Sequence, residues 1–326
     1  MTTTHAPLFT IELLADRRRN LAGLIVHAGA DGGAQPERLP AHEDLSEVAA
    51  RISCFFIPGT TLQDDLLAAG LAPLDQGAVH HSDQLAPLTP HPQARYLSGN
   101  WYLAPPAKPT GAQAASRALA LQLVQLVTAD ADTHEIEAVL RRDPALSYHL
   151  LRLVNSLGMG MSRQITSFAQ AILILGRAQL RRWLNLMLFS SRSNDERSAM
   201  LLARVAVRAR AMELTAKAAG MDKSAQELAF MTGMFSLLGI LFGMPLAEVL
   251  KPLKVSAELL NAVLEYEGDL GQLLRLVECI ERKETSTAAA LLAQLHVPAD
   301  EYNRLLIEAH RWMLDVIQES RGGGHA

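Results

Sequence analysis

The spacing of apolar residues changes near residue 110 and divides the chain into two parts. Before this point the apolar runs are short and prolines interrupt them, whereas after it apolar residues recur every three or four positions. That period is typical of amphipathic helices, which bury one face. It predicts helices over residues 114–129, 135–142, 144–156, 167–175, 177–188, 193–220, 224–243, 245–253, 257–266, 270–283, 286–295 and 299–320.

The most apolar of these segments is residues 224–243, which carry apolar side chains on almost every side. A helix of this kind is buried, because no face tolerates water. Its twenty residues reach the minimum length of a membrane span. Ser224 followed by Glu227 has the spacing of a capping box, however, which favours a helix that begins in water. We therefore expect the central helix of an all-α domain and no membrane segment.

The first 110 residues predict a small α/β module. Eleven of the fifteen prolines lie here, and they prevent long helices. Strands are expected over residues 9–14, 21–26, 52–57 and 96–103, with a short helix over 62–69. A proline-rich linker follows at 105–111. The expected fold class is α+β and multidomain: an α/β module over 1–108 and an all-α bundle over 112–320.

Charge is distributed unevenly, although the net charge is only −4. Residues 141–210 hold twelve arginines but only three carboxylates. Several of these arginines are one helical turn apart and form a candidate surface for an anionic ligand or partner: Arg177, Arg181, Arg182, Arg204 and Arg208. The alternative is a solvated face that pairs with acidic residues elsewhere in the chain. Stacking aromatic residues are scarce in this segment, which argues against single-stranded nucleic acid.

Sequence motifs for catalysis and metal binding are missing. There is no H-E-x-x-H pair, no G-x-S-x-G and no phosphate-binding glycine loop. Cys54 and Cys279 are isolated, so neither a disulfide scaffold nor a zinc site is indicated. The N-terminus lacks the features of a secretory signal, and we expect a cytoplasmic protein without a cofactor.

Four elements of the helical part occur in the order and spacing of one known family. Residues 143–146 (DPAL), 150–156 (LLRLVNS), 165–167 (ITS) and 170–176 (QAILILG) match its successive motifs. They resemble the HDOD domain, the HD-related output domain of bacterial signalling proteins, over roughly residues 112–320. The resemblance implies a helical domain that is similar to the catalytic HD fold but has lost its metal ligands.

The central helix contains the position where those ligands would lie. Residues 233–239 (GMFSLLG) resemble the G-L-L-H-D-I-G stretch of the metal-dependent HD phosphohydrolases. Ser236 and Leu237 stand in place of the histidine and aspartate that bind the metal there. Leucine has no lone pair to donate, and a serine hydroxyl is a poor ligand for a divalent metal. In this alignment Ser236 and Leu237 are lost metal-ligand positions.

Two fragments of the N-terminal part resemble the EAL domain, a barrel-shaped cyclic di-GMP phosphodiesterase. Residues 9–26 are similar to its first hairpin, and residues 96–106 to its last strand. The signature glutamate would fall near Ile25, which cannot replace it. A complete (β/α)₈ barrel needs at least about 200 residues. The resemblance therefore implies a truncated, degenerate remnant.

Together these patterns lead us to expect a non-catalytic bacterial signalling or scaffold protein, and not an enzyme. Its helical domain would act through contacts with protein partners that the sequence does not identify. Two alternatives stay open. One is a binding module for a cyclic dinucleotide or nucleic acid through the arginine-rich face. The other is a residual metal-dependent phosphohydrolase.

Overall fold

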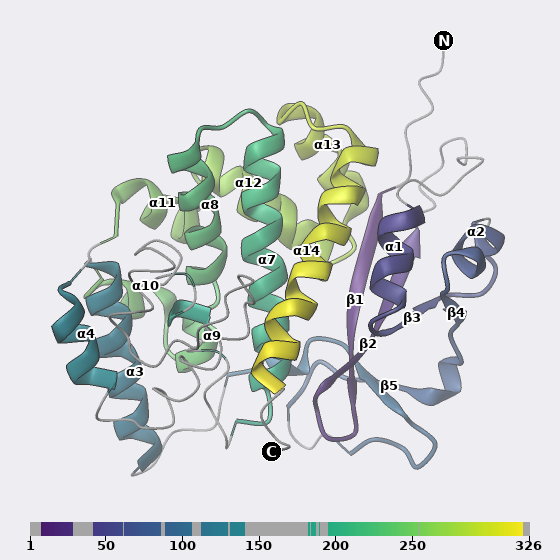
Figure 1. Ribbon diagram of the computed structural model, residues 1–326, viewed down its shortest axis with the longest axis horizontal. Coiled ribbons are helices and arrows are strands. Elements are labelled where there is room, and N and C mark those ends of the chain that lie inside the picture. The colour runs from purple at the N-terminus through teal and green to yellow at the C-terminus, as the bar shows by residue number, and fades with distance from the viewer. Residues whose placement is uncertain are drawn as a thin grey trace, which may run out of the picture.

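A computed structural model describes residues 8–28, 42–60, 62–85, 89–105, 112–129, 131–140, 182, 184–186, 189, 195–253 and 255–321. Figure 1 shows a helical bundle beside a sheet with two short helices of its own. This arrangement confirms the expected α+β layout. The motifs over residues 143–176 lie outside the described residues.

Six strands form the sheet, in the order β4-β3-β2-β1-β6-β5. They are β1 (Phe9–Asp16), β2 (Leu21–Ala28), β3 (Ser53–Phe56), β4 (Ala72–Pro73), β5 (Val79–His81) and β6 (Tyr96–Ser98). Helices α1 (His42–Ala49) and α2 (Gln63–Ala68) connect β2 to β3 and β3 to β4, as parallel neighbours require. β1 runs antiparallel to both of its neighbours, β2 and β6. Short 3₁₀ turns η1 (Gln76–Ala78) and η2 (Trp101–Leu103) complete the region.

The sequence located most of these strands. The predicted hairpin is present, and its turn is closed by the Asp16 carboxylate, which accepts a hydrogen bond from the Asn20 amide at 2.8 Å. The predicted strand over 96–103 is shorter than expected, because Gly99 leaves the extended region at φ +90°. His80 and His81 lie in strand β5, which the sequence patterns did not predict.

The described part of the bundle begins after residue 111. Its helices are α3 (Ala112–Thr128), α4 (Thr133–Leu140), α7 (Ser198–Ala218), α8 (Lys223–Phe235), α9 (Leu238–Phe242), α10 (Leu246–Leu250), α11 (Ala257–Glu265), α12 (Gly268–Glu281), α13 (Thr285–Gln294) and α14 (Ala299–Arg321). Each lies within a segment whose apolar period predicted a helix, with ends shifted by a few residues.

The central segment differs from its prediction in two details. Asp222, and not Ser224, caps α8, with its carboxylate accepting a hydrogen bond from the Ala225 amide at 2.8 Å. The predicted single helix is also interrupted at Ser236 and Leu237, which separate α8 from α9. By length and composition Lys223–Phe242 passes the test for a membrane span, but 61% of its most apolar window is buried. It is the core helix that the sequence predicts.

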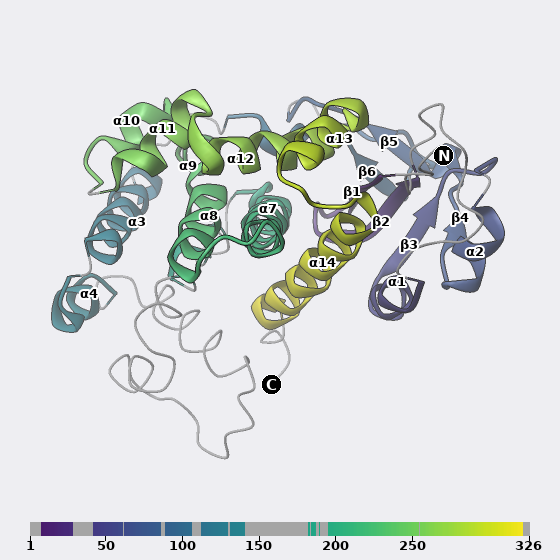
Figure 2. The same cartoon turned by 90° about the horizontal axis from the view of Figure 1, so that it is seen from above.

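One hydrophobic core extends from the sheet through the bundle. A single cluster of buried side chains includes Phe9 of β1, Trp101 of η2, Phe230 of α8 and Met313 of α14. Figure 2 shows α14 between α7 and α1, and it packs against both. The Phe9 amide donates a hydrogen bond to Asn303 of α14 at 2.9 Å inside this core. The two predicted domains thus share one interior, and their boundary near residue 110 stays a prediction.

Candidate functional site

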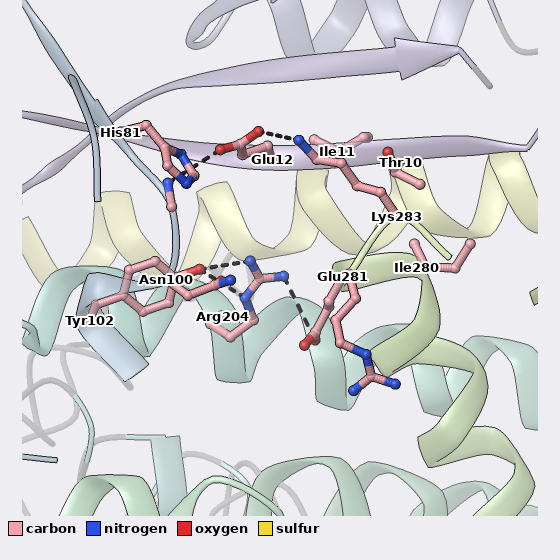
Figure 3. Close-up of a pocket in the computed structure, with 12 residues that line it drawn as sticks. Thr10, Ile11, Glu12, His81, Asn100, Tyr102, Arg204, Ile280, Glu281 and Lys283 are labelled. Carbon is pink, nitrogen blue, oxygen red and sulfur yellow. Dashed lines mark hydrogen bonds and ion pairs between the residues drawn. The ribbon is translucent and has the colours of Figure 1, made fainter. Parts of the chain in front are cut away.

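A cavity of about 110 Å³ lies where the sheet meets the bundle (Figure 3). The sheet contributes the start of β1, the last residue of β5 and the two residues after β6. The bundle contributes α7 and the C-terminal end of α12. β5 and β6 are parallel, so both direct their carboxyl ends toward the cavity. In α/β proteins, ligands bind outside the carboxyl ends of such strands.

Close packing of two loops shapes the sheet side of the cavity. A Cβ atom at Gly99 would lie 2.2 Å from the Ser82 carbonyl oxygen, so only glycine fits there. The approach leaves the Gly99 amide directed at Glu12, whose carboxylate accepts its hydrogen bond at 3.3 Å. Glu12 is thereby held at the edge of the cavity.

Glu12 also joins the two parts of the molecule. Lys283, in the turn after α12, donates to the Glu12 carboxylate at 2.6 Å. Lys283 holds a left-handed backbone conformation with φ +61°, uncommon for a residue other than glycine. Burial would raise the pKa of Glu12, but hydrogen bonds from His27 and Lys283 outweigh it and lower the pKa to about 2. Glu12 is therefore a carboxylate at any physiological pH.

A second contact between the two parts is fully buried. Tyr102 of η2 places its hydroxyl against Arg204 of α7, and accepts hydrogen bonds from Nε at 3.1 Å and Nη2 at 2.7 Å. Arg204 is only 5% exposed. Its guanidinium also lies 3.7 Å from a carboxylate oxygen of Glu281 on α12. The last element of the sheet region and two helices of the bundle thus meet around one cation.

Arg208, one turn further along α7, continues this network. Its Nε and Nη2 donate to both oxygens of Glu281, at 3.0 and 2.5 Å. Its Nη1 donates to Glu278 at 3.1 Å and to the Ser236 hydroxyl at 2.8 Å. Burial would lower the pKa of Arg208, but Glu281 and Glu278 raise it. The Glu281 pKa is correspondingly lowered, because both arginines outweigh its burial.

The divalent metal that the HD phosphohydrolases bind does not fit the residues at the corresponding positions, Ser236 and Leu237. The Ser236 hydroxyl already accepts from Arg208 and donates to the Gly233 carbonyl at 2.7 Å. Leu237 is 3% exposed and offers no donor. Across the described ranges, no group of three or more His, Cys, Asp or Glu side chains is arranged to hold a metal.

The arginines proposed as an anion surface are placed differently from that prediction where the structure describes them. Arg182 pairs with Glu213 at 2.7 Å and with Glu227, and its guanidinium lies over the Phe230 ring. Arg204 and Arg208 are buried against carboxylates as described above. These three are neutralised inside the chain and form no exposed basic face. Arg177 and Arg181 lie outside the described residues.

Sequence reasoning missed the partners of these arginines. Glu278 and Glu281 belong to the network, yet α12 is apolar around them, with Val277 and Ile280 buried. Two acidic residues on the buried side of a helix were the available signal, because a buried carboxylate needs a cation. Glu12 and Lys283 gave no such signal, since they are 271 residues apart.

Comparison with known families resolves what the helical part is. The HDOD domain matches residues 115–298, more than half of the chain. This chain belongs to the HDOD domain family. The HDOD assignment confirms the predicted resemblance and supports the expected class, a signalling protein. Helix α14 and the whole sheet lie outside the matched HDOD region.

Two curated proteins are similar to this chain in sequence. The chain is 32% identical over 199 residues to cyclic di-GMP phosphodiesterase CdgJ of Vibrio cholerae, covering 61% of this chain and 46% of CdgJ. It is 30% identical over 175 residues to the uncharacterized protein YuxH of Bacillus subtilis, covering 53% of this chain and 42% of YuxH. The chain thus spans about half the length of these relatives.

Among solved structures, one from Shewanella amazonensis SB2B named "Putative phosphohydrolase" aligns with a TM-score of 0.42 and 16% identity. The alignment covers 62% of this chain and 93% of that one.

The relatives correct one expectation. The sequence motifs led us to expect a protein that is not an enzyme, but CdgJ carries the name of a phosphodiesterase. That similarity points toward enzymatic activity and overturns the prediction. The missing metal ligands at Ser236 and Leu237 were too narrow a basis for it, because they concern one site in one part of the chain.

Proposed function

We propose that this chain acts in cyclic di-GMP signalling, with the dinucleotide as its substrate or ligand. The observation that carries the proposal is the 32% identity to CdgJ, which is named for its action on this molecule. The chain covers only 46% of CdgJ, so the activity of CdgJ is a proposal for this chain.

The cavity between sheet and bundle is the proposed site. Its lining includes three cations, Arg204, Arg282 and Lys283, and two carboxylates, Glu12 and Glu281. An anionic group that enters would compete with Glu12 for Lys283. The cavity of about 110 Å³ is smaller than the roughly 300 Å³ of ordinary ligand pockets. It suits one phosphate group, with the rest of the dinucleotide outside.

We also propose that the sheet is a shortened EAL-like part. In a closed barrel the first and last strands are neighbours. The two fragments that resemble the first hairpin and the last strand of the EAL domain are β1–β2 and β6, and β6 pairs with β1. This pairing is the arrangement that a remnant of such a barrel would keep.

The test measures binding and turnover of cyclic di-GMP by the full chain. Equilibrium dialysis gives the affinity, and chromatography detects the linear dinucleotide product. Product formation identifies a substrate, and saturable binding without product identifies a ligand. Neither signal at dinucleotide concentrations up to about 1 mM would overturn the proposal.

Two variants locate the site. Lys283→Gln removes one of the two exposed cations that line the cavity, and it should weaken binding about tenfold by loss of one charge-assisted contact. Lys251→Gln is the matched control, because Lys251 is exposed on the bundle away from the cavity. Equal affinity of the two variants would place the dinucleotide elsewhere on the chain.

Contact with a protein partner is a second proposed role, and one surface feature favours it. Among the described residues, four large apolar side chains are exposed. Three of them, Met244, Leu264 and Tyr266, lie in the segment from the end of α9 to the residue that follows α11. Pull-down with the full chain and with Leu264→Asp would test this segment. Equal recovery of a partner by both proteins would exclude it.

A further inference from the structure

The Glu12 carboxylate binds the cation on which an anionic ligand of the cavity would depend. Lys283 donates to it at 2.6 Å, and Figure 3 shows the side chain of Lys283 extended toward Glu12. Carboxylate and phosphate oxygens are both anionic acceptors, and each forms a short charge-assisted hydrogen bond with an ammonium group. Glu12 is thus placed as an intramolecular substitute for a phosphate.

Glu12 can release Lys283 without being left unpaired. Its Oε1 accepts a hydrogen bond from the Gly99 amide at 3.3 Å, and its Oε2 lies 3.3 Å from Nε2 of His27. The Glu12 side chain is only 15% exposed, and a shielded carboxylate without a partner would be costly in free energy. Gly99 and His27 both belong to the sheet region, so they stay beside Glu12 when Lys283 moves away.

The backbone of Lys283 is fixed independently of Glu12. The Lys283 amide donates to the Ile280 carbonyl at 3.1 Å, and the next amide, of Glu284, donates to Cys279 at 2.8 Å. This pair of bonds is the Schellman motif that ends many helices, and its left-handed position is usually glycine. Lys283 holds that position with φ +61°, although a side chain makes it less favourable. Only the side chain, which is 44% exposed, therefore has to swing for the contact to open.

The Glu12 charge also sets the charge balance of the cavity. The lining holds three cations, Arg204, Arg282 and Lys283, and two carboxylates, Glu12 and Glu281. Without the Glu12 charge, the same three cations would face one carboxylate. Arg204 would keep its buried contact with Tyr102, whereas Lys283 would lose its 2.6 Å contact and become available to a ligand.

We propose that Glu12 is a built-in competitor of the ligand: it binds Lys283 in the free protein and lowers the affinity of the cavity for phosphate groups. This inference rests on the proposal that the cavity takes a phosphate group, and it names the residue that regulates entry. The phosphate of a dinucleotide and free inorganic phosphate share the chemistry that Lys283 recognises.

The experiment measures binding of inorganic phosphate to full-length variants by equilibrium dialysis at about pH 7.5 and constant ionic strength. Glu12→Gln keeps an oxygen for the Gly99 amide but removes the charge, and it should bind phosphate about tenfold more tightly than the native protein. Glu12→Gln combined with Lys283→Gln should lose this gain. The matched control is Glu47→Gln, which removes an exposed carboxylate that pairs with Arg311 away from the cavity and should leave the affinity unchanged.

Two results would overturn the proposal. One is a Glu12→Gln protein that binds phosphate no more tightly than the native protein. The other is a gain that persists when Lys283 is also replaced, because the effect would then not pass through the Glu12–Lys283 contact. Should Glu12→Gln fail to fold by circular dichroism, Glu12→Asp takes its place. Its shorter side chain keeps the charge but withdraws from Lys283, so a smaller gain supports the competitor and no gain contradicts it.

Parallel dialysis with cyclic di-GMP separates this inference from the proposed function. Tighter phosphate binding by Glu12→Gln that depends on Lys283, without any binding of cyclic di-GMP, would support the competitor and refute the dinucleotide. Binding of cyclic di-GMP with the same affinity by the native protein and by Glu12→Gln would support the proposed function and refute the competitor.

Discussion

Two sets of polar contacts where the sheet meets the bundle, here called the inner and the outer seam, differ in chemistry. The inner seam consists of Tyr102, Arg204, Arg208, Glu281 and Glu278, and its arginines are 5% exposed. The outer seam joins α1 and the turn after it to α14 through two ion pairs, Arg51–Asp315 and Glu47–Arg311, each at 2.7 Å. In the outer pairs at least one partner is about half exposed.

The difference shows which contacts hold the two parts together. Ion pairs at the surface contribute little, because water screens them and long side chains lose entropy. A buried network costs free energy to desolvate, yet removing one member leaves an uncompensated charge inside. The inner seam should therefore be sensitive to every substitution, and the outer seam tolerant. The predictions below test this contrast from its largest effect to its smallest.

Removing the shared carboxylate of the inner seam should have the largest effect. Glu281→Gln keeps the shape of the side chain but leaves Arg204 and Arg208 short of a counter-charge. We expect a loss of about 3–5 kcal/mol in the free energy of unfolding, measured by urea denaturation. The control is Glu265→Gln, an exposed glutamate of α11. Equal losses in the two variants would refute a buried network at Glu281.

Rebuilding the metal dyad of the HD enzymes should also destabilise the fold. Ser236→His with Leu237→Asp places a carboxylate where a side chain is 3% exposed, and inserts a ring against the Arg208 guanidinium. We expect a loss of about 3 kcal/mol or more and no tight metal binding, because the cation position is already filled. Thermal melting with manganese and zinc gives the answer. If metal raised the Tm of this double variant but not that of the native protein, the chain would still hold the other ligands of the HD metal site, contrary to our inference.

The sequence located the elements of the fold better than the contacts of the site. Local patterns predicted the β1–β2 hairpin and the helices from α7 to α14, since each depends on neighbouring residues. The inner seam joins Tyr102 to Arg204, 102 residues apart, and Arg208 to Glu281, 73 apart. The spacing of apolar residues within one helix or strand gives no information on contacts between residues so far apart in the sequence. The excess of arginines in one segment therefore predicted an exposed basic surface, although the glutamates that pair with Arg204 and Arg208 lie in α12.

Acid should weaken the fold through a histidine of α14. His310 is 2% exposed, and its Nδ1 donates to the Leu306 carbonyl at 2.7 Å. Burial lowers the pKa of His310 to about 4, with Arg204 adding to the effect, and Glu281 and the Leu306 bond opposing it. The unfolded chain has an ordinary histidine pKa near 6.5 and binds the proton first. Stability is thus lost as the pH falls from about 6.5 to about 4, by about 3 kcal/mol.

The measurement is the urea midpoint at pH 7.5, 6, 5 and about 4.5 for the native protein and for His310→Gln, which has no imidazole to protonate. The native midpoint should fall more steeply over this window. Parallel pH profiles would show that His310 is not the group responsible.

Removing one hydroxyl should have a smaller effect on the inner seam. Tyr102→Phe keeps the buried ring but takes away the oxygen that accepts two hydrogen bonds from Arg204. We expect a loss of about 1–2 kcal/mol, the usual penalty for a buried donor without its partner. Tyr96→Phe is the control, because the ring of Tyr96 packs on Phe55 near the opposite end of β6. A neutral Tyr102→Phe would argue that the hydroxyl adds nothing to the contact.

Breaking the outer seam should have the smallest effect. Arg311→Ala removes the ion pair with Glu47, whose side chains are 41% and 60% exposed. We expect a change below about 0.5 kcal/mol in the free energy of unfolding, and a smaller one in about 0.5 M salt, where screening already weakens the pair. The double-mutant cycle with Glu47→Ala isolates the pairwise energy from other losses. The same cycle on Tyr102→Phe and Glu281→Gln should give a coupling several times larger, because Arg204 links those two residues in a buried network. Similar coupling energies in the two cycles would remove the distinction between the seams.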